Sequence, residues 1–118
     1  MGAQVVIHGI KACDTMKKAQ TWLDGHGVAY DFHDYKKAGI TADKLRAWAD
    51  QVGWEVLLNK AGTTFRGLPD ADKQGIDRDK AIALMAAHTS LIKRPVLETP
   101  KGLIVGFKPD VYAASLAK

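Results

Sequence analysis

The chain of 118 residues has one cysteine, Cys13. A lone cysteine excludes an intramolecular disulfide and agrees with a reducing compartment, so we expect a cytoplasmic protein. No hydrophobic run is long enough to span a bilayer, and the first is too short for a signal peptide, so we expect no membrane partner. The four histidines show no metal-ligand spacing with Cys13, so we also expect no metal site.

The charged residues are neither numerous nor gathered in a block. They make up 25% of the chain against 47% hydrophobic residues, which is ordinary for a globular protein. The net charge of +4 indicates anionic partners. Because the 17 basic residues are scattered along the chain, the pattern does not favour a nucleic-acid surface.

The stretch around Cys13 carries the first chemical signal. Val5–His8 reads as a short buried strand, Gly9–Cys13 as a tight loop, and a helix follows. The N–H groups and partial positive charge of a helix N-terminus favour a thiolate, which is the reactive form of cysteine. The residues alone equally allow a buried, inert cysteine at a strand–helix junction. Three lysines lie close in sequence: Lys11, Lys17 and Lys18.

The first third of the chain predicts a βαβ unit. Asp14 or Thr15 is the expected cap of the first helix, and Gly25 and Gly27 are its stop signals. Val28–Tyr35 then alternates apolar and polar residues as a strand does. Two strands joined by a helix of this length form a parallel pair with a right-handed crossover.

The middle of the chain predicts mainly helices. Thr41 is the expected cap of a helix that ends at Gly53, and Asp77 is the expected cap of one that ends near His88 or Thr89. The remaining segments expected here are a loop over Lys36–Ile40, a helical turn over Trp54–Leu58 and a long irregular surface loop over Asn59–Gly75.

The last part of the chain predicts a hairpin and a helix. Pro95 precedes one strand, the turn Thr99–Gly102 follows it, and Leu103–Phe107 returns antiparallel. Pro109 suits the first position of a final helix.

This element order is typical of an α/β protein with a thioredoxin-like mixed four-stranded sheet and a helical insertion. The first and third strands are neighbours in such a sheet, which brings Cys13 and Pro95 together. We therefore expect a single domain over 1–118, with 1–36 and 91–118 as the core and 37–90 as a mainly helical insert.

Four motifs in this order resemble the arsenate-reductase-related (ArsC/Spx) family, which includes glutaredoxin-coupled arsenate reductases, Spx regulators and small YffB-type proteins. The match runs nearly end to end and is most similar to the YffB branch. The motifs are Gly9–Ala19, Gly53–Lys60, Gly62–Arg66 and Leu91–Pro95.

The resemblance implies roles for two residues near the third strand. The peptide bond before Pro95 is expected to be cis and to lie beside the thiol. Arg94 is expected to stabilise the thiolate and to bind a carboxylate or oxyanion bidentately. The residues alone would make Arg94 a solvent-facing group at the entry of a strand.

The chain departs from the arsenate reductases of this family in their oxyanion site. Asn59 and Lys108 stand where two of their three arginines are expected, and Gly9 stands where they have a histidine. His8 is one position earlier and should point to the opposite face of its strand. Met16 stands where some Spx proteins have a second cysteine, so an internal disulfide switch is absent.

The function that this combination favours is a monothiol, glutathione-dependent thiol reductase, an oxidoreductase with Cys13 as its nucleophile. A lone thiol cannot resolve its own oxidised form, so glutathione is expected as co-substrate. Lys11, Arg94 and Lys108 would bind its carboxylates, and Thr15 with the first helical amides would hold the charge of the sulfur. The residues expected to bind substrate or glutathione are Lys11, Thr15, Lys17, Asn59, Arg94, Pro95 and Lys108.

Three alternatives stay open at this point. The chain could be an Spx-like regulator or protein-binding module, in which the fold is a docking surface for a protein partner. It could be an arsenate reductase with an altered oxyanion site. It could also bear a buried Cys13 without any role in sulfur chemistry.

Overall fold

The computed structural model describes residues 5–11 and 13–116. The chain divides into two compact units. The first, called here the sheet unit, comprises residues 1–38 and 94–118, and the second, the helical unit, comprises residues 39–93. No helix among the described residues is both long and apolar enough to cross a membrane.

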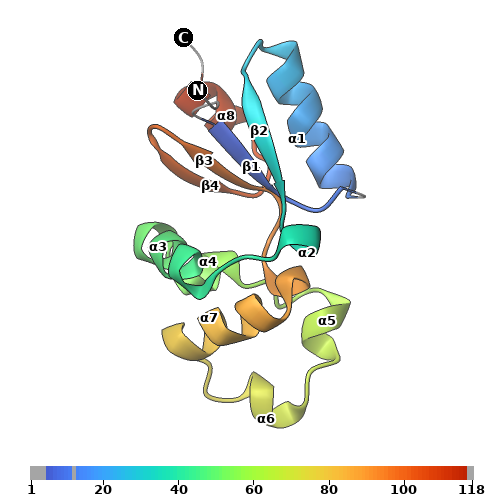
Figure 1. Cartoon of the computed structure of the whole chain (residues 1–118), viewed down its shortest axis with the longest axis vertical. Helices are drawn as coiled ribbons and strands as arrows, with labels where there is room; N and C mark the ends of the chain where they lie inside the picture. The colour runs from blue at the N-terminus through green and yellow to red at the C-terminus, as the bar shows by residue number, and fades with distance from the viewer. Residues whose placement is uncertain (1–4, 12, 117–118) are drawn as a thin grey trace. The chain divides into compact units, whose positions relative to one another are not determined.

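Within the described residues of the sheet unit, four strands form one mixed sheet, seen in Figure 1. They are β1 (Val5–Gly9), β2 (Tyr30–Asp34), β3 (Val96–Thr99) and β4 (Gly102–Val105). Their order in the sheet is β2-β1-β3-β4, with β1 parallel to β2 and the other pairs antiparallel. The predicted sheet, with the first and third strands adjacent, is confirmed.

Two helices pack against the sheet through one apolar cluster. They are α1 (Asp14–Gly25) and α8 (Pro109–Leu116). Every second residue of β1 faces this cluster, as the alternation of a strand requires. Burying each large apolar side chain there contributes about 1.5–3 kcal/mol. The buried members are Val5, Ile7, Met16, Ala19, Leu23, Leu97, Ile104 and Tyr112.

The helical unit is built from short helices with side-chain caps at the two longest. Thr41 Oγ1 accepts the backbone N–H of Lys44, and Asp77 Oδ1 accepts that of Lys80, so both predicted caps are confirmed. The predicted helical turn after Gly53 is present as well. The elements are α3 (Ala42–Val52), α4 (Trp54–Leu57), α5 (Thr63–Arg66), α6 (Asp70–Lys73), α7 (Arg78–Ala87) and the 3-10 helix η1 (Thr89–Leu91).

The loop predictions are wrong in two places. Residues 36–38 belong to the short helix α2 (Tyr35–Ala38), and the stretch predicted as an irregular loop over 59–75 contains α5 and α6. Each of these helices has four residues, barely one turn, and so leaves no hydrophobic periodicity to detect. The strand predicted over Val28–Tyr35 is confirmed only for Tyr30–Asp34.

The first helix also begins differently from the prediction. The N-cap of α1 is Cys13 itself, rather than Asp14 or Thr15, and its backbone is extended with φ −126° and ψ 129°. Extended geometry is usual for an N-cap residue, and Asp14 is then free to occupy the first helical position. This places the sulfur at the point where the helix amides begin.

Candidate functional site

Cys13 lies at the end of the loop after β1 and starts α1. Its carbonyl oxygen accepts the backbone N–H of Lys17 at 3.1 Å, which closes the first turn of the helix. The side chain is half-buried and packs against the edge of the apolar cluster. The thiol is therefore held in place by packing but is not sealed from solvent.

The surroundings of Cys13 favour its thiolate. Burial alone raises the pKa of the thiol, because it removes the charged form from water. The backbone N–H of Met16, the Arg94 side chain and the backbone N–H of Thr15 all donate toward the sulfur, and the charge of Arg94 adds to them. These groups outweigh burial, so the pKa of Cys13 is lowered. The Cys13 side chain does not form a standard N-cap hydrogen bond.

Arg94 reaches the sulfur from the segment that precedes β3. The Arg94–Pro95 peptide bond is cis, which confirms the prediction made from the resemblance. Val96 pairs with His8 in the sheet, so the start of β3 lies beside the end of β1, where the cysteine loop leaves. The guanidinium is half-buried and hydrogen-bonds Cys13. Among the described residues, Arg94 is the one whose side-chain charge lowers the pKa of Cys13.

Tyr35 is a residue of this site that the sequence did not reveal. It is wholly buried at the start of α2, directly after β2. Burial raises the pKa of its hydroxyl, and the Arg94 guanidinium, which hydrogen-bonds it, lowers the pKa by less, so the phenol stays neutral. Arg94 therefore donates to both Cys13 and Tyr35. The sequence offered only an alternating pattern that made Tyr35 the last residue of a strand.

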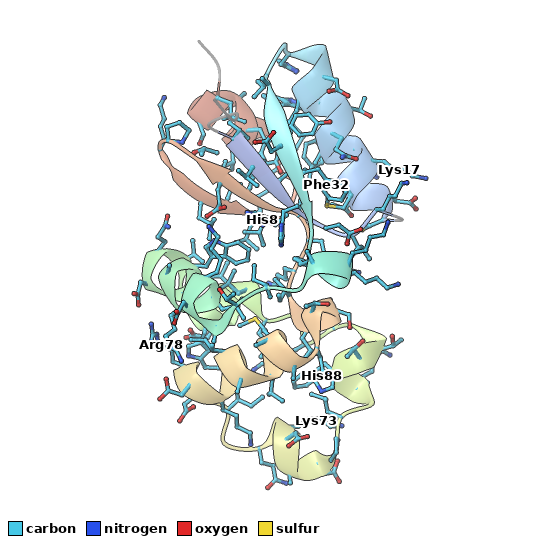
Figure 2. All side chains as sticks on the ribbon, viewed as in Figure 1. His8, Lys17, Phe32, Lys73, Arg78 and His88 are labelled. Carbon is cyan, nitrogen blue, oxygen red and sulfur yellow. The ribbon has the colours of Figure 1, made fainter. Side chains whose placement is uncertain are left out.

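The three other predicted residues near Cys13 lie around it in different ways. The Thr15 backbone faces the sulfur. Lys11 is exposed in the loop before Cys13 and lines a recess with residues of β2 and α2. Lys17 is exposed on α1, and Figure 2 shows its side chain directed away from the sheet. It borders a groove of about 420 Å³ that is lined by Lys17, Lys18, Thr21, Trp22 and Phe107.

The remaining two predicted residues have structural contacts of their own. Lys108 is exposed, and its carbonyl oxygen accepts the N–H of Tyr112 at 2.9 Å at the start of α8. Asn59 belongs to the helical unit, where its side-chain oxygen accepts the N–H of Ala61 at 3.2 Å. Its backbone N–H donates to Leu91 O at 2.7 Å. The sheet unit thus brings Cys13, Thr15 and Arg94 together.

The Met16 side chain fills the space that a side chain at Gly9 would need. A Cβ atom at this position would overlap Met16 Sδ and lie 2.7 Å from Met16 Cε, and Met16 is wholly buried. His8 lies on the alternate face of β1, where its ring nitrogen Nε2 hydrogen-bonds Glu98. A histidine at position 9, such as the arsenate reductases of the resembling family have, would have to displace Met16.

Comparison with known proteins shows which family the chain belongs to. The model of the ArsC family matches residues 8–115. The chain belongs to the ArsC family. Its fold is thioredoxin-like, as predicted from the order of the elements along the sequence.

Individual relatives of this ArsC-family chain cover nearly its whole length. The solved structure of a protein named YffB is 62% identical, covers 96% of this chain and 99% of its own, and has a TM-score of 0.93. An uncharacterised protein of Haemophilus influenzae is 37% identical over 96% of this chain and 99% of its own. The global transcriptional regulator Spx of Streptococcus pyogenes is 27% identical over 91% of this chain and 81% of its own.

Proposed function

We propose that this ArsC-family protein is a monothiol, glutathione-dependent thiol reductase with Cys13 as its nucleophile. The observation that supports this most directly is the lowered pKa of Cys13, caused by the helix amides and Arg94 against the opposing effect of burial. Thiolates attack disulfides, whereas thiols do not. Partial exposure of the sulfur leaves it accessible to a substrate.

The reaction begins on a mixed disulfide of glutathione and a second thiol compound. The Cys13 thiolate attacks the glutathione sulfur, forming a Cys13–glutathione disulfide and breaking the bond to the second sulfur. The second compound leaves as a thiolate and takes a proton from water. Arg94 and the amides of Thr15 and Met16 stabilise the negative sulfur before attack.

A second glutathione completes the cycle, because Cys13 is the only cysteine in the chain. Its thiolate attacks the sulfur of the bound glutathione, oxidised glutathione leaves, and the Cys13 thiolate is restored. In each cycle one glutathione thiol is oxidised and one substrate thiol is released, while the glutathione sulfur of the mixed disulfide stays at the disulfide level, so the electrons balance. A cycle that consumes reduced glutathione suits the cytoplasm, where we propose that the protein works.

Mass spectrometry of the intact protein after exposure to oxidised glutathione tests this proposal. We expect a gain of one glutathione that is absent in Cys13→Ser and is reversed by excess reduced glutathione. Wild-type protein that gains no glutathione across neutral to mildly alkaline pH would contradict the proposal. Arsenate reduction is assayed beside it, because Gly9, Asn59 and Lys108 depart from the arsenate-reductase pattern.

The Spx relatives support a second candidate, a protein-binding regulator in which Cys13 has no catalytic task. Here a docking surface carries the function, and substitution of the cysteine leaves binding intact. Affinity capture with wild-type protein and Cys13→Ser separates the two. A stoichiometric protein partner that both forms retain would favour the regulator, and capture of a disulfide-linked partner by the wild type alone would favour the reductase.

A further inference from the structure

A cationic recess lies directly beside the cysteine loop. Its volume is about 350 Å³, and its lining comes from the loop after β1 and from the junction of β2 with α2. Asp34 pairs with Gly9 in the parallel register of β1 and β2, so the start of α2 is held against the start of the cysteine loop. The lining residues are Ile10, Lys11, Asp34, Lys36 and Lys37.

Positive charge dominates this recess. Three lysines line it against one carboxylate. That carboxylate faces the backbone, since Asp34 Oδ1 accepts the N–H of Lys36 at 3.0 Å and of Lys37 at 3.3 Å. Among the described residues, none of the three lysines forms an ion pair within the chain. All three lysines are exposed, so their ammonium groups are available to an anion.

The recess is within reach of the nucleophile. Lys11 is two residues before Cys13, so their Cα atoms are at most about 7 Å apart. A compound with its sulfur at Cys13 and a carboxylate a few bonds away can therefore span the two. Arg94 acts on the sulfur itself and helps to lower the pKa of the Cys13 thiol. The lysines of the recess are not among the groups that lower this pKa. Their charge serves a group at some distance from the sulfur.

We infer that the recess formed by Lys11, Lys36 and Lys37 is a carboxylate-binding subsite that selects anionic small disulfides for attack by Cys13. This rests on the proposed reductase function and adds Lys36 and Lys37, which the sequence did not single out. Lysine ammonium groups on flexible side chains can bind a carboxylate that arrives from solvent. The rigid two-pronged geometry of an arginine guanidinium is not required for such binding. Their field also raises the encounter rate with anions, an effect that salt weakens.

Two disulfides of similar size and different charge test the subsite. Dithiodipropionate carries two carboxylates, and bis(2-hydroxyethyl) disulfide carries none. Each reacts with Cys13 in the same way, since one half becomes bonded to Cys13 and the other leaves as a free thiol. We expect wild-type protein to react faster with the dianion, and we expect this preference to weaken at higher salt.

The ratio of the two rates is measured in Lys36→Gln, Lys37→Gln and the double variant. Using the ratio cancels any change in the intrinsic reactivity of Cys13. In the double variant, the ratio of the rate with the dianion to the rate with the neutral disulfide should fall about two- to tenfold. This is the range expected for the loss of two exposed charge pairs. Lys101→Gln removes one exposed charge from the turn before β4 and is the matched control for each single variant, with the ratio expected to stay unchanged.

The outcomes separate the subsite from the reductase function. An equal rate ratio in wild type and the double variant would overturn the subsite while leaving the reductase function standing. Failure of Cys13 to form a bond with either disulfide would overturn the reductase function instead. If Lys101→Gln lost as much of the preference for the dianion as each single variant, the preference would come from the net charge of the protein. That result would also overturn the subsite.

Discussion

The N-terminus of α1 in the sheet unit differs from those of α3 and α7 in the helical unit. Thr41 and Asp77 cap α3 and α7 with side-chain oxygens, at 3.1 and 2.9 Å from the amide nitrogens of Lys44 and Lys80. At the same position α1 has Cys13, whose thiol makes no such hydrogen bond. The backbone position is alike in all three, but the atom that meets the free amides is different.

This difference separates stability from reactivity. An oxygen cap satisfies a free amide and stabilises a helix by about 1 kcal/mol. Neutral sulfur is a weak acceptor, so α1 forgoes most of that stabilisation. The amides at the start of α1 then act mainly on the Cys13 thiolate. Together with Arg94, they lower the pKa of Cys13. The N-terminus of α1 makes the cysteine more reactive, whereas the N-termini of α3 and α7 stabilise the fold.

Replacing the sulfur with oxygen should break the comparison most completely. Cys13→Ser loses all reaction with oxidised glutathione, while its free energy of unfolding changes by no more than about 1 kcal/mol, because the serine oxygen can supply the cap that the thiol lacks. Mass spectrometry and urea unfolding measure the two quantities. A Cys13→Ser variant that still gained glutathione would show that another group carries the reaction.

Removing the guanidinium should have the next largest effect. Arg94→Met removes a charge-assisted hydrogen bond to the sulfur, and we expect the rate of Cys13 alkylation near neutral pH to fall about tenfold. Stopped-flow labelling with iodoacetamide measures it, with Lys93→Met as the neighbouring control. An unchanged rate in Arg94→Met would assign the thiolate to the helix amides alone.

The pH dependence of stability should separate the two kinds of helix start. Because the pKa of Cys13 is lower in the folded protein, the unfolded chain binds more protons between the two pKa values, and stability rises with pH there. The extra stability is complete above the unfolded value of about 8.5 and is lost as pH falls through the folded pKa. Urea unfolding of wild type and Cys13→Ser should diverge in this window, and parallel curves would refute the lowered pKa.

Loss of the Tyr35 hydroxyl should have a smaller effect. Tyr35→Phe removes a group that the Arg94 guanidinium binds besides the Cys13 sulfur, so the guanidinium is held less firmly at the sulfur. We expect alkylation of Cys13 to slow about two- to threefold, as for loss of one modest hydrogen bond. Tyr112→Phe is the matched control, since that buried hydroxyl donates to Gly106 O at 3.3 Å. Equal slowing in both would point to general loosening.

Removing an oxygen cap should leave the chemistry alone. Thr41→Ala should lower the free energy of unfolding by about 1 kcal/mol and leave the rate of Cys13 alkylation unchanged. Denaturant unfolding and labelling of the same preparation measure both. A slower Cys13 in this variant would mean that the starts of α1 and α3 are not independent.

The sequence predicted those features that depend on local chemistry. Thr41 and Asp77 were identified as caps because good cap residues precede apolar positions at helical spacing. Arg94 lies 81 positions from Cys13, and only the family resemblance linked the two. The cis peptide bond before Pro95 was predicted from the same family resemblance.

The features that the sequence missed depend on register and on very short elements. Tyr35 was assigned to a strand because alternation continued through it, whereas it begins the four-residue helix α2. The recess with Lys36 and Lys37 exists because Gly9 pairs with Asp34, a register that no local pattern reveals. Cys13 was not recognised as the N-cap, because cysteine is not a preferred cap residue.

Direct titration of the Cys13 thiol tests the central claim most directly. The ultraviolet absorbance of the thiolate, followed against pH with Cys13→Ser as the blank, gives its pKa in the folded protein. The account predicts a value below that of a free cysteine, moving upward in Arg94→Met. A value at or above the free one, about 8.5, would contradict it.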